Sequence, residues 1–388
     1  MVSLPQSQQH TFLVNAMLSL AAAHLAYLVP HDIRYQRAKQ IHLGRALHDY
    51  REALSAPITA DNCDPLFGGA VLVHYLLWCD LSFMDGQGPL AASDHPLDLS
   101  GDRLYWLSTG QRQIFFMAWP LFQRPGSIFM RVGILQPCMA LSDEVDARGL
   151  NWRRYAREFE NIYKNPRFHG DRSGQPSLYP ADTSSTSSFQ TPPSPPLSEP
   201  SVCPMTAMFN PPEDPVPGGY YGFERPTDSS LRVSTLFEGY REGEMFVRSG
   251  GVANEMLTWA AYKRLAERVA IAMAFVADAR RNGSSSTLGF QKDPVMGWYT
   301  STFRQEDMVR YVLTFPMLCF GPLLPLISSG DSRMLVLLYH IYQVVEALLP
   351  TDQFWWCRQR VAVMKEAMRE ELRIRGLEVC MRDHSAAV

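Results

Sequence analysis

Aromatic residues with polar ends gather in the last part of the chain. Trp355 and Trp356 stand next to each other after Phe354, and Tyr339 and His340 lie on the preceding helical segment. Rings of this kind combine an apolar wall with a hydrogen-bonding group, which suits a pocket for a small hydrophobic molecule. Core packing where two helices meet explains the same pattern, so the sequence leaves both interpretations open.

The segment 314–327 adds apolar side chains next to irregular backbone. Pro316, Pro322 and Pro325 each lack a backbone N–H donor, so this segment cannot form one regular helix. Irregular backbone beside a core is a common place for a ligand cleft, and a plain connector is the other interpretation. The predicted ligand-binding residues are Phe315, Met317, Phe320, Tyr339, His340, Trp355 and Trp356.

Two polar clusters raise an enzymatic alternative. The first holds Asp143, Glu144 and Asp146, and the second holds Asn254 and Thr258. Because Mg²⁺ prefers hard oxygen ligands, the clusters loosely resemble the magnesium-binding motifs of class I terpene cyclases, lyases that act on a prenyl diphosphate. Tyr262 stands where the second motif needs a carboxylate, and short acidic clusters are usually solvated caps. The main hypothesis therefore assigns no catalytic residue, metal or cofactor, and the alternative assigns Mg²⁺ to these five residues.

Charge and cysteine content bear on other functions. The net charge is −3, and basic residues form only short pairs such as Arg153-Arg154 and Arg280-Arg281, so direct DNA contact is not expected. The seven cysteines include no Cys-x-x-Cys, so neither a zinc cluster nor a redox dithiol can form locally. The sequence also lacks Gly-x-Ser-x-Gly, a P-loop and His-Glu-x-x-His.

Helices must position all of these residues. Apolar residues at helical spacing predict helices near 12–29, 33–55, 64–84, 102–122 and 152–163, and again near 255–281, 305–315, 332–348 and 353–375. No period-two strand pattern is evident, so the predicted fold class is all-α. Segment 12–29 is apolar but short for a bilayer, which favours a buried core helix over a membrane span. His24, His74 and His340 are predicted to be satisfied core histidines, and Cys79 and Cys319 buried small hydrophobes.

A change of composition divides the chain. Twelve of the 28 prolines lie in residues 171–220, together with a run of Ser and Thr. Such a segment cannot bury enough apolar surface to offset its ordering entropy, so a flexible linker is predicted there. The prediction is thus one large multi-helix bundle with an N-terminal half in 1–170, a disordered Pro/Ser-rich linker in 171–220, and a C-terminal half in 221–388 with the hydrophobic pocket.

Three blocks carry a family resemblance. They are His10–Leu25 with the following helix and Asn62–Phe67; Trp106–Arg112; and Phe315–Cys319 with Ser329–His340 and Trp355-Trp356. In order and spacing they resemble the C-terminal regulatory domain of fungal binuclear zinc-cluster transcription factors of the sterol-uptake-control type. The likeness spans most of the chain and is interrupted by the predicted linker.

The resemblance implies an all-α regulatory domain that dimerises and holds a hydrophobic small molecule between its C-terminal helices. The family places a six-cysteine zinc cluster before this domain, and this sequence carries none. We therefore expect a transcriptional regulator or co-regulator of metabolic or secondary-metabolite genes, in the nucleus or cytoplasm. It would form a homodimer, or a heterodimer with a full-length zinc-cluster factor that contacts DNA for it.

Overall fold

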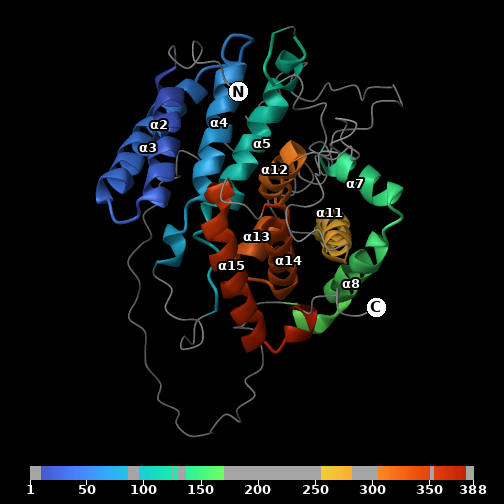
Figure 1. The fold of residues 1–388 in the computed structure, drawn as a ribbon. Coiled ribbons are helices and arrows are strands. Elements are labelled where there is room, and N and C mark those ends of the chain that lie inside the picture. Colours follow the sequence, from blue (N-terminus) through green and yellow to red (C-terminus); the bar gives the residue numbers. More distant parts are fainter. Residues whose placement is uncertain are drawn as a thin grey trace, which may run out of the picture. The chain divides into compact units, whose positions relative to one another are not determined.

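The computed structural model describes residues 10–85, 96–124, 126–129, 137–169, 255–281, 305–349 and 354–381, and within these ranges it holds helices and no strand (Figure 1). The all-α prediction is confirmed. The longer helices are α2 (Thr11–Leu28), α3 (Ile33–Leu54), α4 (Cys63–Trp78), α5 (Arg103–Phe122), α7 (Pro137–Ala147), α8 (Trp152–Lys164), α11 (Glu255–Arg281), α12 (Gln305–Thr314), α13 (Leu323–Ser328), α14 (Ser332–Leu348) and α15 (Trp355–Ile374).

Aspartate side chains fix where three of these helices begin. Asp32, Asp102 and Asp331 each precede a first turn, and each carboxylate accepts a hydrogen bond from the backbone N–H two residues later, at 2.9–3.0 Å. These bonds satisfy donors that have no partner inside the helix. The observed starts of α3, α5 and α14 therefore lie within a residue or two of the starts predicted from the sequence.

Two elements differ from the sequence-based prediction. The helix expected to reach residue 84 ends at Trp78 and is followed by the short 3₁₀ helix η1 (Ser82–Met84). Helix α7 was not predicted, because its acidic residues were interpreted as a solvated cluster.

The prediction that 314–327 does not form one regular helix is confirmed, since this segment contains the 3₁₀ helix η5 (Pro316–Leu318) and then α13. The predicted linker 171–220 lies outside the described residues.

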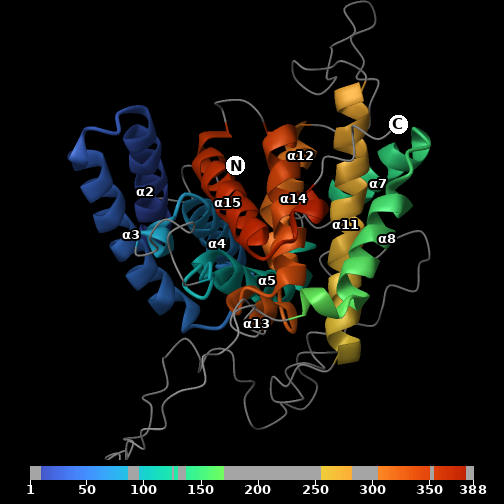
Figure 2. The same ribbon diagram turned by 90° about the horizontal axis from the view of Figure 1, so that it is seen from below.

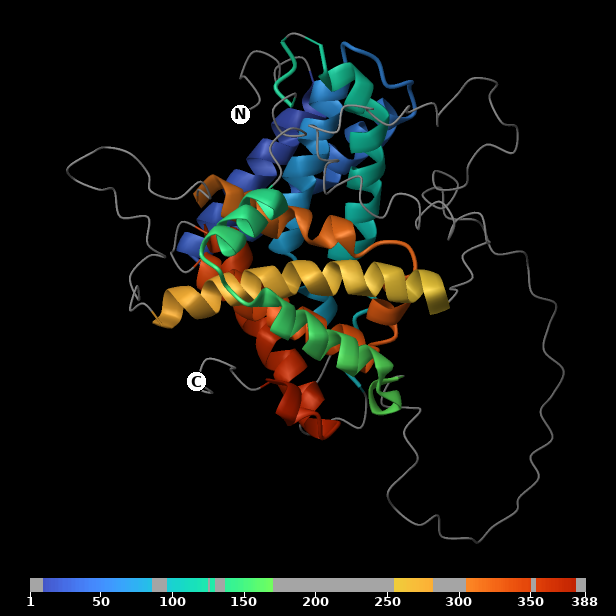
Figure 3. The ribbon, with the colours of Figure 1, turned by 90° about the vertical axis from the view of Figure 1, so that its right-hand side faces the viewer.

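Helix α14 occupies the middle of the packing and is buried along almost its whole length. Helices α15 and α11 lie on either side of it (Figure 2). Helix α8 runs along α11 on its outer side, with α7 packed next to them (Figure 3). Helix α15 in turn contacts α4, so the described segments from both sides of residues 171–220 belong to one compact unit.

The α2–α3 hairpin forms the edge of this unit next to α4. Phe12 and Leu13 of α2, Tyr50 of α3, and Leu66 and Ala70 of α4 make a small apolar cluster of their own. The outward side of α2 is also apolar. By length and composition α2 and the segment Cys63–Met84 could each cross a membrane, a test that core helices of globular proteins also pass.

Candidate functional site

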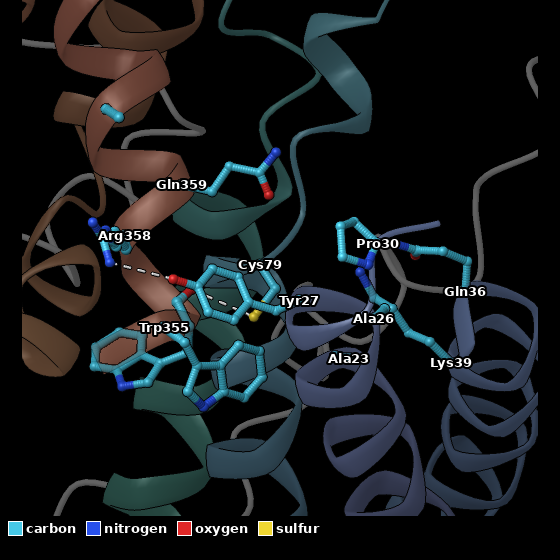
Figure 4. A pocket seen from close by; sticks show the side chains of 12 residues that line it. Ala23, Ala26, Tyr27, Pro30, Gln36, Lys39, Cys79, Trp355, Arg358 and Gln359 are labelled. Atoms are coloured by element: carbon cyan, nitrogen blue, oxygen red, sulfur yellow. Dashed lines mark hydrogen bonds between the residues drawn. The ribbon is translucent and has the colours of Figure 1, made fainter. Parts of the chain in front are cut away.

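A pocket of about 460 Å³ lies where the α2–α3 hairpin meets α15 and the end of α4 (Figure 4). This volume falls within the usual range for small-molecule sites. Three groups of side chains line it: Ala23, Ala26, Tyr27 and Pro30 from α2 and its end, Gln36 and Lys39 from α3, and Cys79, Trp355, Trp356, Arg358, Gln359 and Ala362 from the end of α4 and from α15.

Helical spacing explains why these residues face one cavity. On α15, Trp355, Arg358, Gln359 and Ala362 recur at three- and four-residue intervals and therefore share a face. On α2, Ala23 and Ala26 do the same, and their small side chains leave space between the backbones of α2 and α15. The pocket exists because alanines stand where larger residues would fill the space.

The pocket has an apolar floor and a polar rim. Ala23, Ala26 and Trp356 are buried, and Cys79 and Trp355 are half-buried. Gln36, Arg358 and Gln359 are exposed at the rim. Apolar lining with a few polar groups is the usual composition of sites that bind small organic molecules.

Two aromatic contacts hold Trp355 in place at the edge of the floor. The His24 imidazole stacks on the Trp355 ring, with ring centroids 4.6 Å apart and an interplanar angle of 14°. The Tyr27 ring lies tilted to the same indole at 6.1 Å, and Arg358 Nη1 donates a hydrogen bond to the Tyr27 hydroxyl at 3.5 Å. His24 is therefore an exposed stacking partner, and its predicted place in the core is wrong.

The Cys79 thiol is a structural part of the floor. Its single S–H can donate to the carbonyl oxygen of Tyr75, 3.3 Å from Sγ, or to that of Trp356, 3.4 Å from Sγ. Burial raises the pKa of this thiol to about 12, although the charge of Lys39 acts in the opposite direction. Cys79 thus stays protonated at neutral pH and is a poor nucleophile. Cys319, by contrast, is fully buried as predicted.

A buried ion pair fixes the wall behind the pocket. Arg360 of α15 pairs with Asp102, the N-cap of α5, and both side chains are buried. The same guanidinium donates to the carbonyl oxygen of Leu77 at 3.3 Å, in the last turn of α4, and to that of Asp80 at 2.7 Å, just past the end of α4. It also donates to the Tyr342 hydroxyl at 3.2 Å. Arg360 therefore joins α15 to α4, α5 and α14. Sequence reasoning missed this residue, because nothing near it in the chain signals its partners.

The predicted ligand-binding residues divide into two groups. Trp355 and Trp356 line the pocket. Phe315 and Met317 are buried in the core, Phe320 lies under the Arg112 guanidinium at 3.7 Å, and Tyr339 and His340 are buried on α14. None of these five lines the pocket. His340 Nε2 hydrogen-bonds the Cys380 carbonyl oxygen at 2.9 Å, which fits its prediction as a satisfied core histidine.

The lining residues that were not predicted are Ala23, Ala26, Tyr27, Lys39 and Arg358, among others. For the lining residues of α15, the sequence carries a signal: Arg358, Gln359 and Ala362 stand three, four and seven positions after Trp355 and so share its face of the helix. The residues of α2 and α3 carry no such signal, since their approach to α15 is a tertiary contact.

The residues of the magnesium alternative are not brought together as far as the structure describes them. Asp143 and Asp146 are exposed on α7, and Glu144 pairs with Arg148 at 2.7 Å. Thr258 is buried on α11, and Asn254 lies outside the described residues. Tyr262 is a core residue, with its ring 4.9 Å from that of Tyr163. Among described residues no three His, Cys, Asp or Glu side chains form a group that could hold a metal ion.

Comparison with known proteins gives one informative similarity. A Zn(2)-C6 fungal-type transcription factor from Gibberella zeae is 32% identical to this chain over 84 residues. The match covers 22% of this chain and 17% of that protein, so it spans less than a fifth of the relative's length. No protein-family profile and no solved structure matches the chain. The similarity relates part of the chain to a fungal transcription factor.

Proposed function

We propose that this chain is a regulator or co-regulator of transcription whose helical domain senses a small organic molecule. The similarity to a Zn(2)-C6 fungal-type transcription factor is the observation that carries the proposal. The pocket between the α2–α3 hairpin and α15 supports the sensing part, because it has the size and lining of a small-molecule site. Metabolic or secondary-metabolite genes are the proposed targets, and the nucleus is the proposed location.

Sensing would act through the packing of helices around the pocket. A molecule that contacts Trp355 of α15 and Tyr27 of α2 at once favours the arrangement that holds these helices together. A ligand shifts such an equilibrium only by as much as its affinity differs between the two arrangements. Arg360 holds the other side of α15 in place, so movement is expected at the α2–α3 hairpin.

Dimerisation is part of the proposal, with a second copy of this chain as the partner. Val14, Leu18, Ala21, Leu25 and Leu28 follow each other along α2 at alternating four- and three-residue spacing, the spacing of a helix-pairing seam. Leu18, Leu25 and Leu28 are 45%, 41% and 59% exposed. Since α2 contains no Asp, Glu, Lys or Arg, the same face of a second copy brings no charge repulsion.

The test is to tether the full chain to a heterologous DNA-binding domain upstream of a reporter gene. We expect reporter expression that differs from the level set by the DNA-binding domain alone, because a regulator brought to a promoter changes its output. Equal expression in the two strains, with the fusion protein present in the nucleus, would overturn the proposed function.

A further inference from the structure

The charged side chains that line the pocket all have one sign. Its lining contains two cations, Lys39 from α3 and Arg358 from α15, and no carboxylate. Figure 4 shows the two side chains on either side of Tyr27. A pocket with an apolar floor and only positive charges is complementary to a molecule with an apolar body and a negative group.

Of the two cations, Lys39 gives the stronger argument for an anionic ligand. Its side chain is half-buried, and its charge acts on the Cys79 thiol in the floor. Lys164 and Lys365 each pair with a glutamate, at 2.6 and 2.5 Å, whereas Lys39 makes no ion pair with any residue that the structure describes. A partly desolvated ammonium gains free energy when an anion comes within hydrogen-bond distance.

Tyr27 supplies a second polar group. Its hydroxyl oxygen accepts a hydrogen bond from Arg358 at 3.5 Å. A phenol that accepts in this way keeps its own proton for donation to another acceptor. Lys39 and Tyr27 therefore both offer donors at the pocket, while Trp355 and Trp356 offer the apolar surface.

We propose that the pocket binds an amphipathic carboxylic acid in its ionised form, with an aromatic or branched apolar body against Trp355 and Trp356 and the carboxylate at Lys39. This inference rests on the proposed sensing function and names the chemical class of the ligand. A neutral hydrophobic molecule would fill the same floor but leave the ammonium of Lys39 without a counter-charge.

Isothermal titration calorimetry on the full chain tests this with naphthalene-2-carboxylate and its neutral amide, naphthalene-2-carboxamide. We expect one site per chain that prefers the carboxylate. Lys39→Gln should weaken carboxylate binding about 10-fold and leave amide binding unchanged, because a charge-assisted hydrogen bond contributes about 1.5 kcal/mol or more and partial exposure keeps it near that lower limit. The control Lys263→Gln removes an exposed lysine of α11 and should leave both affinities unchanged.

Equal affinity for the two probes, no binding of either, or equal weakening of both by Lys39→Gln would overturn the carboxylate inference. The outcome is separable from the tethering experiment. A silent reporter with a carboxylate-selective pocket would contradict the regulatory function alone. An active reporter with no selectivity for the anion would contradict the ligand class alone.

Discussion

At the scale of single residues, buried polar groups connect the helices around the pocket. His74 of α4 is one of them: its Nε2 accepts a hydrogen bond from Trp78 Nε1 at 3.3 Å, and its Nδ1 lies 3.2 Å from Ser108 Oγ. Because the Ser108 hydroxyl donates to the Leu104 carbonyl oxygen, His74 Nδ1 must donate to Ser108. A proton added at Nε2 would face the indole N–H of Trp78, so the neutral imidazole is the form that fits.

This geometry leads to a pH dependence of stability. Burial is the main cause that lowers the pKa of His74 to about 4; a hydrogen bond to the Leu313 backbone acts in the opposite direction, and the charge of Arg360 adds to the lowering. An unfolded histidine titrates at about 6.5. Between these values only the unfolded chain takes up a proton, so the contribution of His74 to stability is present above about pH 6.5 and is lost as the pH falls towards about 4.

The variant that tests this pH dependence is His74→Gln. Its amide can accept a hydrogen bond from Trp78 and donate one to Ser108, but it does not titrate. Urea unfolding measures the free energy of unfolding of both proteins at about pH 6.5 and about pH 4.5. The decrease between these two pH values should be about 2 kcal/mol larger for the wild type than for the variant. Parallel decreases in the two proteins would show that His74 is protonated in the folded state.

At the scale of helices, much of the fold could be predicted from sequence. Apolar periodicity located α3, α5, α11, α14 and α15, because this signal is local. What the sequence could not predict depends on distant contacts. Arg360 looks like an ordinary polar residue of α15, and its partner Asp102 is 258 positions away. The pocket was missed on its α2 side for the same reason, whereas the tryptophans of α15 carried a local signal.

Two glycines of the hairpin region give a matched test of close helix packing. A Cβ atom on Gly69 of α4 would lie 2.9 Å from Phe12 Cε2 and 3.0 Å from Tyr50 Cε2. The Tyr50 ring cannot easily move, because its hydroxyl donates to the Leu66 carbonyl oxygen at 2.8 Å. A Cβ atom on Gly44 of α3 meets nothing within 4 Å.

Gly69→Ala is therefore expected to lower the free energy of unfolding by about 1–3 kcal/mol through overpacking. Gly44→Ala should raise it by about 0.5–1 kcal/mol, since alanine loses less conformational entropy in a helix. Chemical denaturation of the three proteins measures both effects. If Gly69→Ala stabilised the chain as Gly44→Ala does, α2, α3 and α4 would not pack as closely as described.

At the scale of the whole molecule, the proposed dimer places the apolar outer face of α2 at its interface. Light scattering after size-exclusion chromatography should give the mass of a dimer for the wild type and of a monomer for the double variant Leu18→Glu, Leu25→Glu, because four glutamates would meet at the seam. Met256→Glu changes an exposed apolar residue of α11 and should leave the dimer intact.

A wild-type monomer, or a dimer that survives the double variant, would rule out this seam. In the first case, co-purification with a full-length zinc-cluster factor, lost in the double variant, would assign the α2 face to a heterodimer instead of a second copy.

The most direct measurement compares reporter output from the tethered wild type, Ala362→Trp and Arg373→Trp. Ala362 is exposed and lines the pocket, so a tryptophan there fills the cavity without displacing core residues. Arg373 lies about three turns further along α15, outside the lining. We expect the wild type and Arg373→Trp to alter reporter expression equally, and Ala362→Trp to set a different level because its pocket is permanently occupied. Identical output from all three proteins, at equal protein levels, would contradict a link between the pocket and transcription.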